Sequence, residues 1–142
     1  MDPVTTVQKV TPVLVVEKIE PVVSFWKKLA VPPTTEVPSS AGDGLVFAIF
    51  SAAGVEIMYQ TAASVQEDLV GAASVKEAFR PGPQQSTLYI EVGNLADVES
   101  RLQGEQLVMP RRTTFYGATE VAYADPAGNI IVFAHRNKNA GT

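Results

Sequence analysis

The sequence predicts an α+β domain of two βαβββ modules, which form a curved mixed sheet around a cleft. Two observations predict this architecture. Residues 118–135 read as strand, turn and strand, and residues 46–59 repeat that pattern when Gly54 is set against Gly128, an offset of 74 residues. The segments in front of the two hairpins also align, at an offset of 76 residues. A repeat of this length indicates two copies of one supersecondary unit, each too small to close its own core.

The first module covers residues 7–60 approximately. Residues 8–16 are of strand type. Pro12 confines this strand to the edge of a sheet or to a place where its missing N–H is not needed. Pro21 suits the first turn of a helix, and an apolar stripe at helical spacing follows it: Val22, Phe25, Trp26 and Leu29. Because Trp26 belongs to this stripe, we expect it to pack in the core rather than to stack on a ligand. We expect a short strand at residues 34–37 and the first hairpin at residues 45–60.

Residues 61–85 are predicted to link the modules. Ser64 with Glu67, and Ser74 with Glu77, have the spacing of a capping box, in which a serine and a glutamate three residues later satisfy free N–H groups at a helix start. We therefore expect two short helical turns, with a break near Gly71.

The second module covers residues 86–136. We expect a strand at 86–92, a helix capped by Asn94, a strand at 107–114 and the closing hairpin. The hairpin turn is Asp125-Pro126-Ala127-Gly128-Asn129, in which proline fixes φ, glycine accepts a positive φ and aspartate can bond to its own backbone. Residues 137–142 are expected to be a frayed tail.

Composition narrows the function. The chain has 142 residues, no cysteine and a net charge of −4, so disulfides and thiolate metal sites are excluded. Nucleic acid is not expected as a partner, since phosphate binding depends on lysine and arginine. The acidity mildly favours a cationic ligand. The sequence shows neither a signal-peptide pattern nor an apolar run of membrane-spanning length, so we expect a cytoplasmic protein without a membrane partner.

Specific motifs in the second half resemble those of a known superfamily. Tyr116-Gly117, followed by the Ala-Asp-Pro-Ala-Gly-Asn-Ile-Ile run of residues 124–131, is similar to the closing hairpin of the vicinal oxygen chelate superfamily. Ser24-Phe25-Trp26 is similar to a motif on that superfamily's first helix. The superfamily includes glyoxalase I, extradiol dioxygenases and the fosfomycin and bleomycin resistance proteins. The resemblance covers nearly the whole chain and implies the glyoxalase/bleomycin resistance/dioxygenase fold.

The same resemblance implies where a metal would be held. Enzymes of the superfamily use histidine, glutamine and glutamate ligands, and the matching positions here are Thr11, Met58, Thr87 and Val132. Threonine is a poor ligand for a catalytic divalent ion, methionine is soft and valine has no donor atom. A rescue through Glu56 and Gln60 is unfavourable, because they are four residues apart on one strand. We therefore expect no metal and no cofactor.

Strand alternation predicts which side chains line the cleft. It places Val13, Val15, Ile130 and Ala134 there, and it turns His135, the only histidine, to the opposite face. Tyr116 lies in a turn at the mouth and can stack on a ligand. The alternative is a merely hydrated sheet face, but a pocket is favoured because the implied fold makes this face concave. The candidate ligand-binding residues are Thr11, Glu56, Met58, Gln60, Thr87, Tyr89, Glu91, Tyr116 and Val132.

The charged candidates have two interpretations each. Glu56 and Glu91 can pair with a cationic ligand, or one of them can act as a base if its pKa is raised. We favour the alternative that each lies at a rim, solvated or paired with Arg111 or Arg112. Alternation turns only one of these two arginines inward, and a solvated strand edge is their favoured role.

We therefore expect a metal-independent protein that binds or sequesters a small organic molecule in the cleft between the modules, and no catalytic residue is identified. By resemblance to bleomycin resistance proteins, a homodimer is implied. The alternatives are a lyase or dioxygenase that holds a divalent metal through atypical ligands, and a structural or partner-binding protein whose cleft its own side chains fill.

Overall fold

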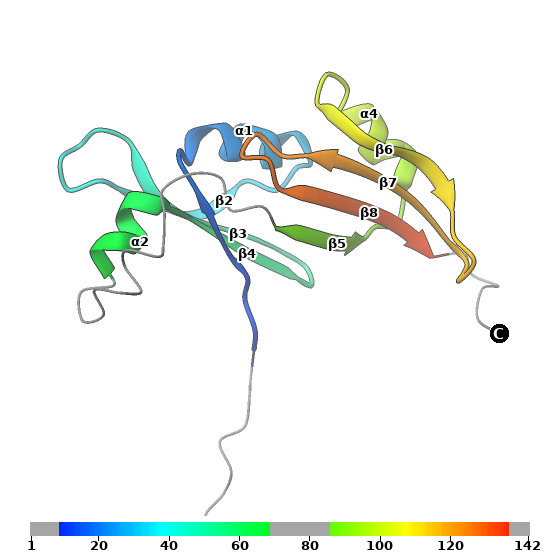
Figure 1. Ribbon diagram of the computed structural model, residues 1–142, viewed down its shortest axis with the longest axis horizontal. Coiled ribbons are helices and arrows are strands. Elements are labelled where there is room, and N and C mark those ends of the chain that lie inside the picture. Colours follow the sequence, from blue (N-terminus) through cyan, green and yellow to red (C-terminus); the bar gives the residue numbers. More distant parts are fainter. Residues whose placement is uncertain (1–8, 69–85, 137–142) are drawn as a thin grey trace, which may run out of the picture.

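The chain folds into two mixed four-stranded sheets that lie side by side (Figure 1). The computed structural model describes residues 9–68 and 86–136. The first sheet has the order β1 (Val13–Val16), β4 (Val55–Thr61), β3 (Leu45–Ala52) and β2 (Pro33–Pro38). The second has the order β5 (Thr87–Glu91), β8 (Ile130–Arg136), β7 (Ala118–Ala124) and β6 (Gln106–Thr113). The two orders are equivalent strand by strand, so the predicted βαβββ repeat is confirmed.

Two helices cover the same side of the sheets (Figure 1). They are α1 (Glu20–Lys28) and α4 (Leu95–Arg101), and each turns its apolar stripe inward, including Trp26 on α1 and Val98 on α4. Their buried side chains and the helix-facing residues of both sheets form one hydrophobic core. The other side of the sheets is covered by neither α1 nor α4, and we call it the open face.

The segment after the first sheet corrects one prediction. The helix α2 (Ala62–Asp68) follows β4 directly, and its capping residue is Thr61, whose Oγ1 accepts from the N–H of Ser64 at 3.3 Å. Ser64 is therefore not the cap, and its own hydroxyl accepts from Gln60 instead. The second predicted helical turn at residues 74–77, and the predicted tail, lie outside the described residues. Within the described ranges, no helix is long and apolar enough to cross a membrane.

The first strand is shorter than predicted. β1 begins at Val13, and residues 9–12 of the predicted strand lie outside it, because Pro12 has no N–H to add to the ladder. The carbonyl of Pro12 still accepts from the N–H of Met58 at 3.0 Å. Pro12 therefore lies next to an edge strand, at a place where its missing N–H is not needed, as the sequence predicted.

The turn between β7 and β8 joins the two modules. The Asp125 carboxylate accepts from the backbone N–H groups of Ala127 and Asn129, and it also accepts from the hydroxyl of Tyr59 on β4, at 3.0 Å. That hydroxyl in turn accepts from the indole of Trp26, at 3.0 Å. This buried hydrogen-bond chain therefore runs from α1 through the first sheet to the last turn of the second, and Trp26 is a core residue as predicted.

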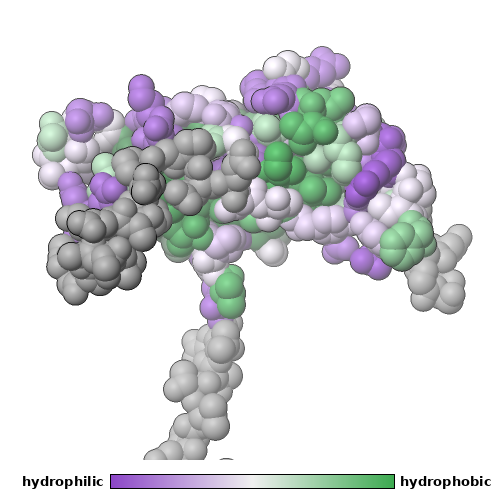
Figure 2. All heavy atoms as spheres, in the orientation of Figure 1, coloured by the Kyte–Doolittle hydropathy of each residue, from purple (hydrophilic) through white to green (hydrophobic). Residues whose placement is uncertain are grey.

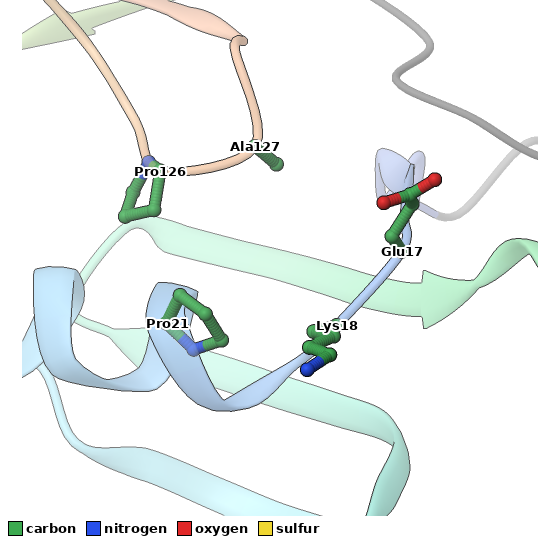
Figure 3. A pocket seen from close by; sticks show the side chains of 5 residues that line it. All are labelled: Glu17, Lys18, Pro21, Pro126 and Ala127. Carbon is green, nitrogen blue, oxygen red and sulfur yellow. The ribbon is translucent and has the colours of Figure 1, made fainter.

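Figure 3 shows the outer side of the same junction. Pro126 and Ala127 of the turn face Pro21 on the first turn of α1, beside Glu17 and Lys18, and these residues line a hollow of about 260 Å³. The two modules therefore contact each other through this turn as well as through the core.

Replacing Gly128 by alanine should destabilise the protein by about 1–2 kcal/mol. Gly128 has a φ of +90°, which alanine adopts only with strain, although an added Cβ would meet no atom within 4 Å. The matched control is Gly93→Ala, which also meets no atom but lacks a positive φ. Urea unfolding of both variants checks this, and equal free energies of unfolding would contradict it.

Candidate ligand site on the open face of the sheets

The register of the strands places the predicted cleft residues together on the open face. Val13 is in register with Met58 in the first sheet, and Tyr89 with Val132 in the second. Ile131 and Phe133, on the alternate positions of β8, are buried in the core, and the ring of His135 contacts the carbonyl of Val92 there at 3.1 Å. The predicted alternation is confirmed, and His135 lies on the side away from the open face.

A residue that the sequence reasoning missed lies at the centre of the second sheet's open face. Glu120, on β7, is 1% exposed. Its Oε2 accepts from the hydroxyls of Tyr89 and Tyr116 at 2.6 and 2.5 Å, and its Oε1 accepts from Nε and Nη2 of Arg112, both at 3.2 Å. We call Glu120, Tyr89, Tyr116 and Arg112 the Glu120 cluster. It brings two predicted candidates, Tyr89 and Tyr116, onto one buried carboxylate.

Small residues make the Glu120 cluster possible. β8 lies between β5, which carries Tyr89, and β7, which carries Glu120. The Tyr89 side chain must therefore cross β8, since neighbouring strands lie about 4.8 Å apart. The position on β8 in register with Glu120 is Ala134, and the one on β7 in register with Val132 is Ala122. These two alanines leave room for the ring, and they are themselves covered, at 1% and 2% exposure.

The carboxylate of Glu120 is ionised at neutral pH. Desolvation by burial raises the pKa of Glu120 and is the largest single effect, but the hydrogen bonds from Tyr116, Tyr89 and Arg112 together outweigh it, so the net pKa is lowered. The pKa of Tyr89 is raised, first by its hydrogen bond to Glu120 and then by burial. Glu120 is therefore a carboxylate that accepts from two phenol hydroxyls, and it is too weak a base to serve in proton transfer.

Three tyrosines, Tyr59, Tyr89 and Tyr123, should titrate abnormally. The pKa of Tyr59 is raised by burial and the Asp125 charge, that of Tyr123 by burial, and that of Tyr89 as above, all from 10.0. A raised folded-state pKa means that stability is complete below pH 10 and falls as the pH rises beyond it. We therefore expect tyrosinate absorbance to appear mainly with alkaline unfolding. Titration of three of the four tyrosines near pH 10 in folded protein would contradict this.

The first sheet carries a second carboxylate on the open face. Glu56 accepts from Thr11 and Ser51, both at 3.2 Å, and pairs with Lys9 at 2.9 Å. The hydrogen bond from Lys9 is the largest effect on its pKa, which is lowered. Two predicted candidates, Thr11 and Glu56, therefore contact each other, and Glu56 is a paired carboxylate rather than a base.

The polar candidates Glu91 and Gln60 also have partners. Glu91 pairs with Arg136 at 3.3 Å, and Gln60 donates to Ser64 and Asp68 of α2. Of the two forms of the rim interpretation, solvated or paired with Arg111 or Arg112, the pairing is not found, because Arg111 bonds to Glu99 on α4 and Arg112 to Glu120. One arginine of the pair does turn to the open face, as predicted, and it is Arg112.

The residues at the superfamily's metal positions do not fit a metal. Thr87, Met58 and Val132 lie on the open face with Thr11, and the set has no carboxylate or imidazole donor. Among residues 9–68 and 86–136, no group of three or more histidine, cysteine, aspartate or glutamate side chains could hold an ion. Glu120 is occupied by three donors of its own.

The structure also delimits hollows away from the Glu120 cluster. One of about 270 Å³ lies between α1, β5 and α4, with Trp26 and Val98 in its wall. Another, of about 850 Å³, is lined mainly by the loop between β2 and β3 and by α2. No residue of the Glu120 cluster lines either of these two hollows.

Known structures share this architecture. A glyoxalase/bleomycin resistance protein/dioxygenase from Nocardioides is 19% identical, with a TM-score of 0.67 over 96% of this chain and 89% of that one. A glyoxalase-related enzyme from Fulvimarina pelagi is 17% identical, with a TM-score of 0.68 over 95% and 96%. The chain has the glyoxalase/bleomycin resistance/dioxygenase fold.

This fold also contains a protein with a bound drug. A bleomycin-binding protein complexed with bleomycin is 11% identical, with a TM-score of 0.59 over 92% of this chain and all of that one. No protein-family model and no curated protein sequence matches the chain. At these identities the likeness establishes the fold and leaves the function to the residues of the open face.

Proposed function

We propose that this protein binds a small organic molecule on the open face of its second sheet, without a metal ion. The observation that carries the proposal is the Glu120 cluster. A carboxylate that is 1% exposed is costly to bury unless it is paired and hydrogen-bonded, and here its partners are side chains that remain in reach of a ligand. Tyr89 is 49% exposed and Tyr116 is 41% exposed.

The surroundings support a small-molecule site. Val132 is half-buried and gives the accessible part of an apolar floor, which Ala122 and Ala134 continue underneath the cluster at 2% and 1% exposure. A few convergent polar groups stand beside Val132, which is the usual composition of small-molecule sites. Phe115, in the turn beside Tyr116, is fully exposed, and the two rings pack edge to face at 5.1 Å. Aromatic rings held on a turn at the rim of a sheet are suited to stacking on a bound molecule.

A ligand panel tests this proposal. Aromatic, cationic and glycopeptide compounds, bleomycin among them, would be added singly while the NMR signals of Tyr89 and Tyr116 are followed. We expect shifts at both tyrosines with at least one compound. Shifts confined to other residues, or no response across the panel, would contradict the proposal. Trp26 is a poor reporter, because it is buried on the helix side.

The alternative is a lyase or dioxygenase that holds a metal through atypical ligands. Elemental analysis of protein purified without chelator separates it from our proposal. We expect far less than one equivalent of any transition metal. A near-stoichiometric metal would favour the alternative.

We also propose a homodimer, as the resemblance to bleomycin resistance proteins implies. The half-exposed apolar residues of the open face, Val13 among them, would lose solvent contact in such a pair. Sedimentation equilibrium at micromolar concentration checks this, and a monomer mass would contradict it.

A further inference from the structure

We propose that the ligand of the open face carries a planar cation, a guanidinium or amidinium group, which displaces Arg112 from Glu120. This inference rests on the proposed function and names the chemical class of its ligand. Arg112 would then be an internal stand-in for the ligand, held on Glu120 while the site is empty.

The two oxygens of Glu120 are held with different strength. The phenols reach Oε2 at 2.6 and 2.5 Å, whereas Nε and Nη2 of Arg112 lie 3.2 Å from Oε1. Charge-assisted N–H···O bonds are normally about 2.7–2.9 Å long, so the arginine contacts are long for their kind. The Arg112 side chain is also 59% exposed. Arg112 is therefore the weakest and most accessible donor on the carboxylate.

The strand that carries Arg112 is suited to movement. β6 is the outer strand of its sheet, paired on one side with β7 alone. Its register with β7 shifts between Met109 and Arg112. An irregular edge strand has fewer ladder hydrogen bonds to hold it, and the long arginine side chain can swing out into water without moving the backbone.

The phenols favour a donor group on the ligand. Each hydroxyl donates its one hydrogen bond to Glu120. The oxygen lone pairs of Tyr89 and Tyr116 can therefore only accept hydrogen bonds from a ligand. A guanidinium or amidinium offers several coplanar N–H donors, which can reach Oε1 and a phenol oxygen together. The exposed tyrosine rings would add cation–π attraction.

An anion or a neutral group fits less well in the place of Arg112. Glu120 stays ionised at neutral pH because its pKa is lowered. Removing the arginine without a new cation would leave a buried carboxylate with one oxygen unpaired, which is strongly destabilising. An anion would add repulsion to that loss. Half-buried Val132 and the exposed ring of Tyr89, which are in register, offer an apolar contact to an aromatic body, so the ligand class is an aromatic amidine or guanidine.

Benzamidine and benzamide are the matched probes, because they have similar size and shape and differ in charge. NMR titration of Tyr89 and Tyr116 gives the affinity of each for the wild-type protein. We expect benzamidine to bind at least about 10-fold more tightly, roughly the effect of one charge-assisted bond. In Glu120→Gln the preference should vanish, since the charge is gone and the shape is kept.

Arg112→Ala tests the displacement itself. Without its internal competitor, Glu120 should bind benzamidine about 10-fold more tightly than in wild type. The control is Arg111→Ala, whose side chain bonds to Glu99 on α4 and should leave the affinity unchanged. Weaker or unaltered benzamidine binding by folded Arg112→Ala would overturn the displacement. If that variant fails to fold, the ratio of the affinities for benzamidine and benzamide, measured on wild type and on Glu120→Gln, still decides whether Glu120 recognises a cation.

The outcomes for the function and for the inference are separable. Equal binding of benzamide and benzamidine at Tyr89 and Tyr116 would overturn the cationic ligand class and leave the open face as a binding site. A preference that persists in Glu120→Gln would also overturn it. The absence of any shift at the two tyrosines, with these probes and with the whole panel, would remove the proposed function as well.

Discussion

Asp125→Ala is expected to lower the free energy of unfolding by roughly 3–5 kcal/mol, because it orphans several buried donors at once. The Asp125 carboxylate, 3% exposed, accepts from the backbone of Ala127, from the backbone and side chain of Asn129, and from Tyr59. Each buried donor left without a partner costs about 1–3 kcal/mol. For a chain of this size the loss corresponds to a melting temperature lower by about 10–15 °C.

Denaturant unfolding and calorimetry measure this effect. Asp43→Ala is the control, because Asp43 is an exposed loop residue and its loss should cost less than about 0.5 kcal/mol. Tyr59→Phe should cost about 1–2 kcal/mol, since it removes the link between Trp26 and Asp125 but keeps the turn. Equal stability of Asp125→Ala and Asp43→Ala would show that the buried chain does not join the modules.

The second large effect concerns binding. Val132→Lys should weaken the binding of panel compounds at least about 100-fold, equivalent to 2.7 kcal/mol. Val132 lies half-buried on the floor of the site, in register with Tyr89 on one side and Ala122 on the other. A lysine there would cover the floor and bring a second internal cation towards Glu120.

Folding should survive this substitution, because a lysine on the open face can extend its ammonium group into water. Leu107→Lys is the matched control. Leu107 is an exposed apolar residue on β6, in register with Tyr123, whose side chain faces the helices. Its lysine variant should bind as the wild type does. Undiminished binding by folded Val132→Lys would place the ligand elsewhere.

Local sequence patterns were sufficient to predict the architecture. The repeated hairpin and the turn of residues 125–129 predicted the succession of elements along both modules, since turn chemistry and strand alternation are local properties. The alternation also placed Tyr89 and Val132 correctly on one face. What the pattern could not show was that the Asp125 side chain reaches Tyr59, 66 residues away, because that contact depends on how the modules pack.

The main omission was Glu120. The metal positions implied by the resemblance lie on the first and last strands of each module, and none of them lies on β7, which carries Glu120. The sequence did carry a signal, because Glu120 is an acidic residue inside an otherwise apolar strand, four residues after Tyr116. A charge at such a place requires a partner. Its partner Arg112 lies directly opposite on β6, but the strand pattern does not fix the register of β6 on β7, which shifts on both sides of Met109.

Outside the Glu120 cluster, apolar side chains are also exposed on β6, an outer strand of the second sheet. Figure 2 shows apolar residues gathered over the region of β6 and β7, where Leu107 and Val108 are exposed on the outer strand. The same strand carries two arginines and Pro110, which discourage edge-to-edge pairing of sheets. The edge role predicted for the arginine pair therefore agrees with the position of Arg111, whereas Arg112 serves the Glu120 cluster.

The most direct test is to locate the tightest-binding panel compound by intermolecular nuclear Overhauser effects. The binding of a ligand around Glu120 predicts contacts from the compound to the rings of Tyr89 and Tyr116 and to the methyl groups of Val132, in protein free of metal. Contacts confined to Trp26 and Val98, in the hollow between α1 and α4, would contradict it.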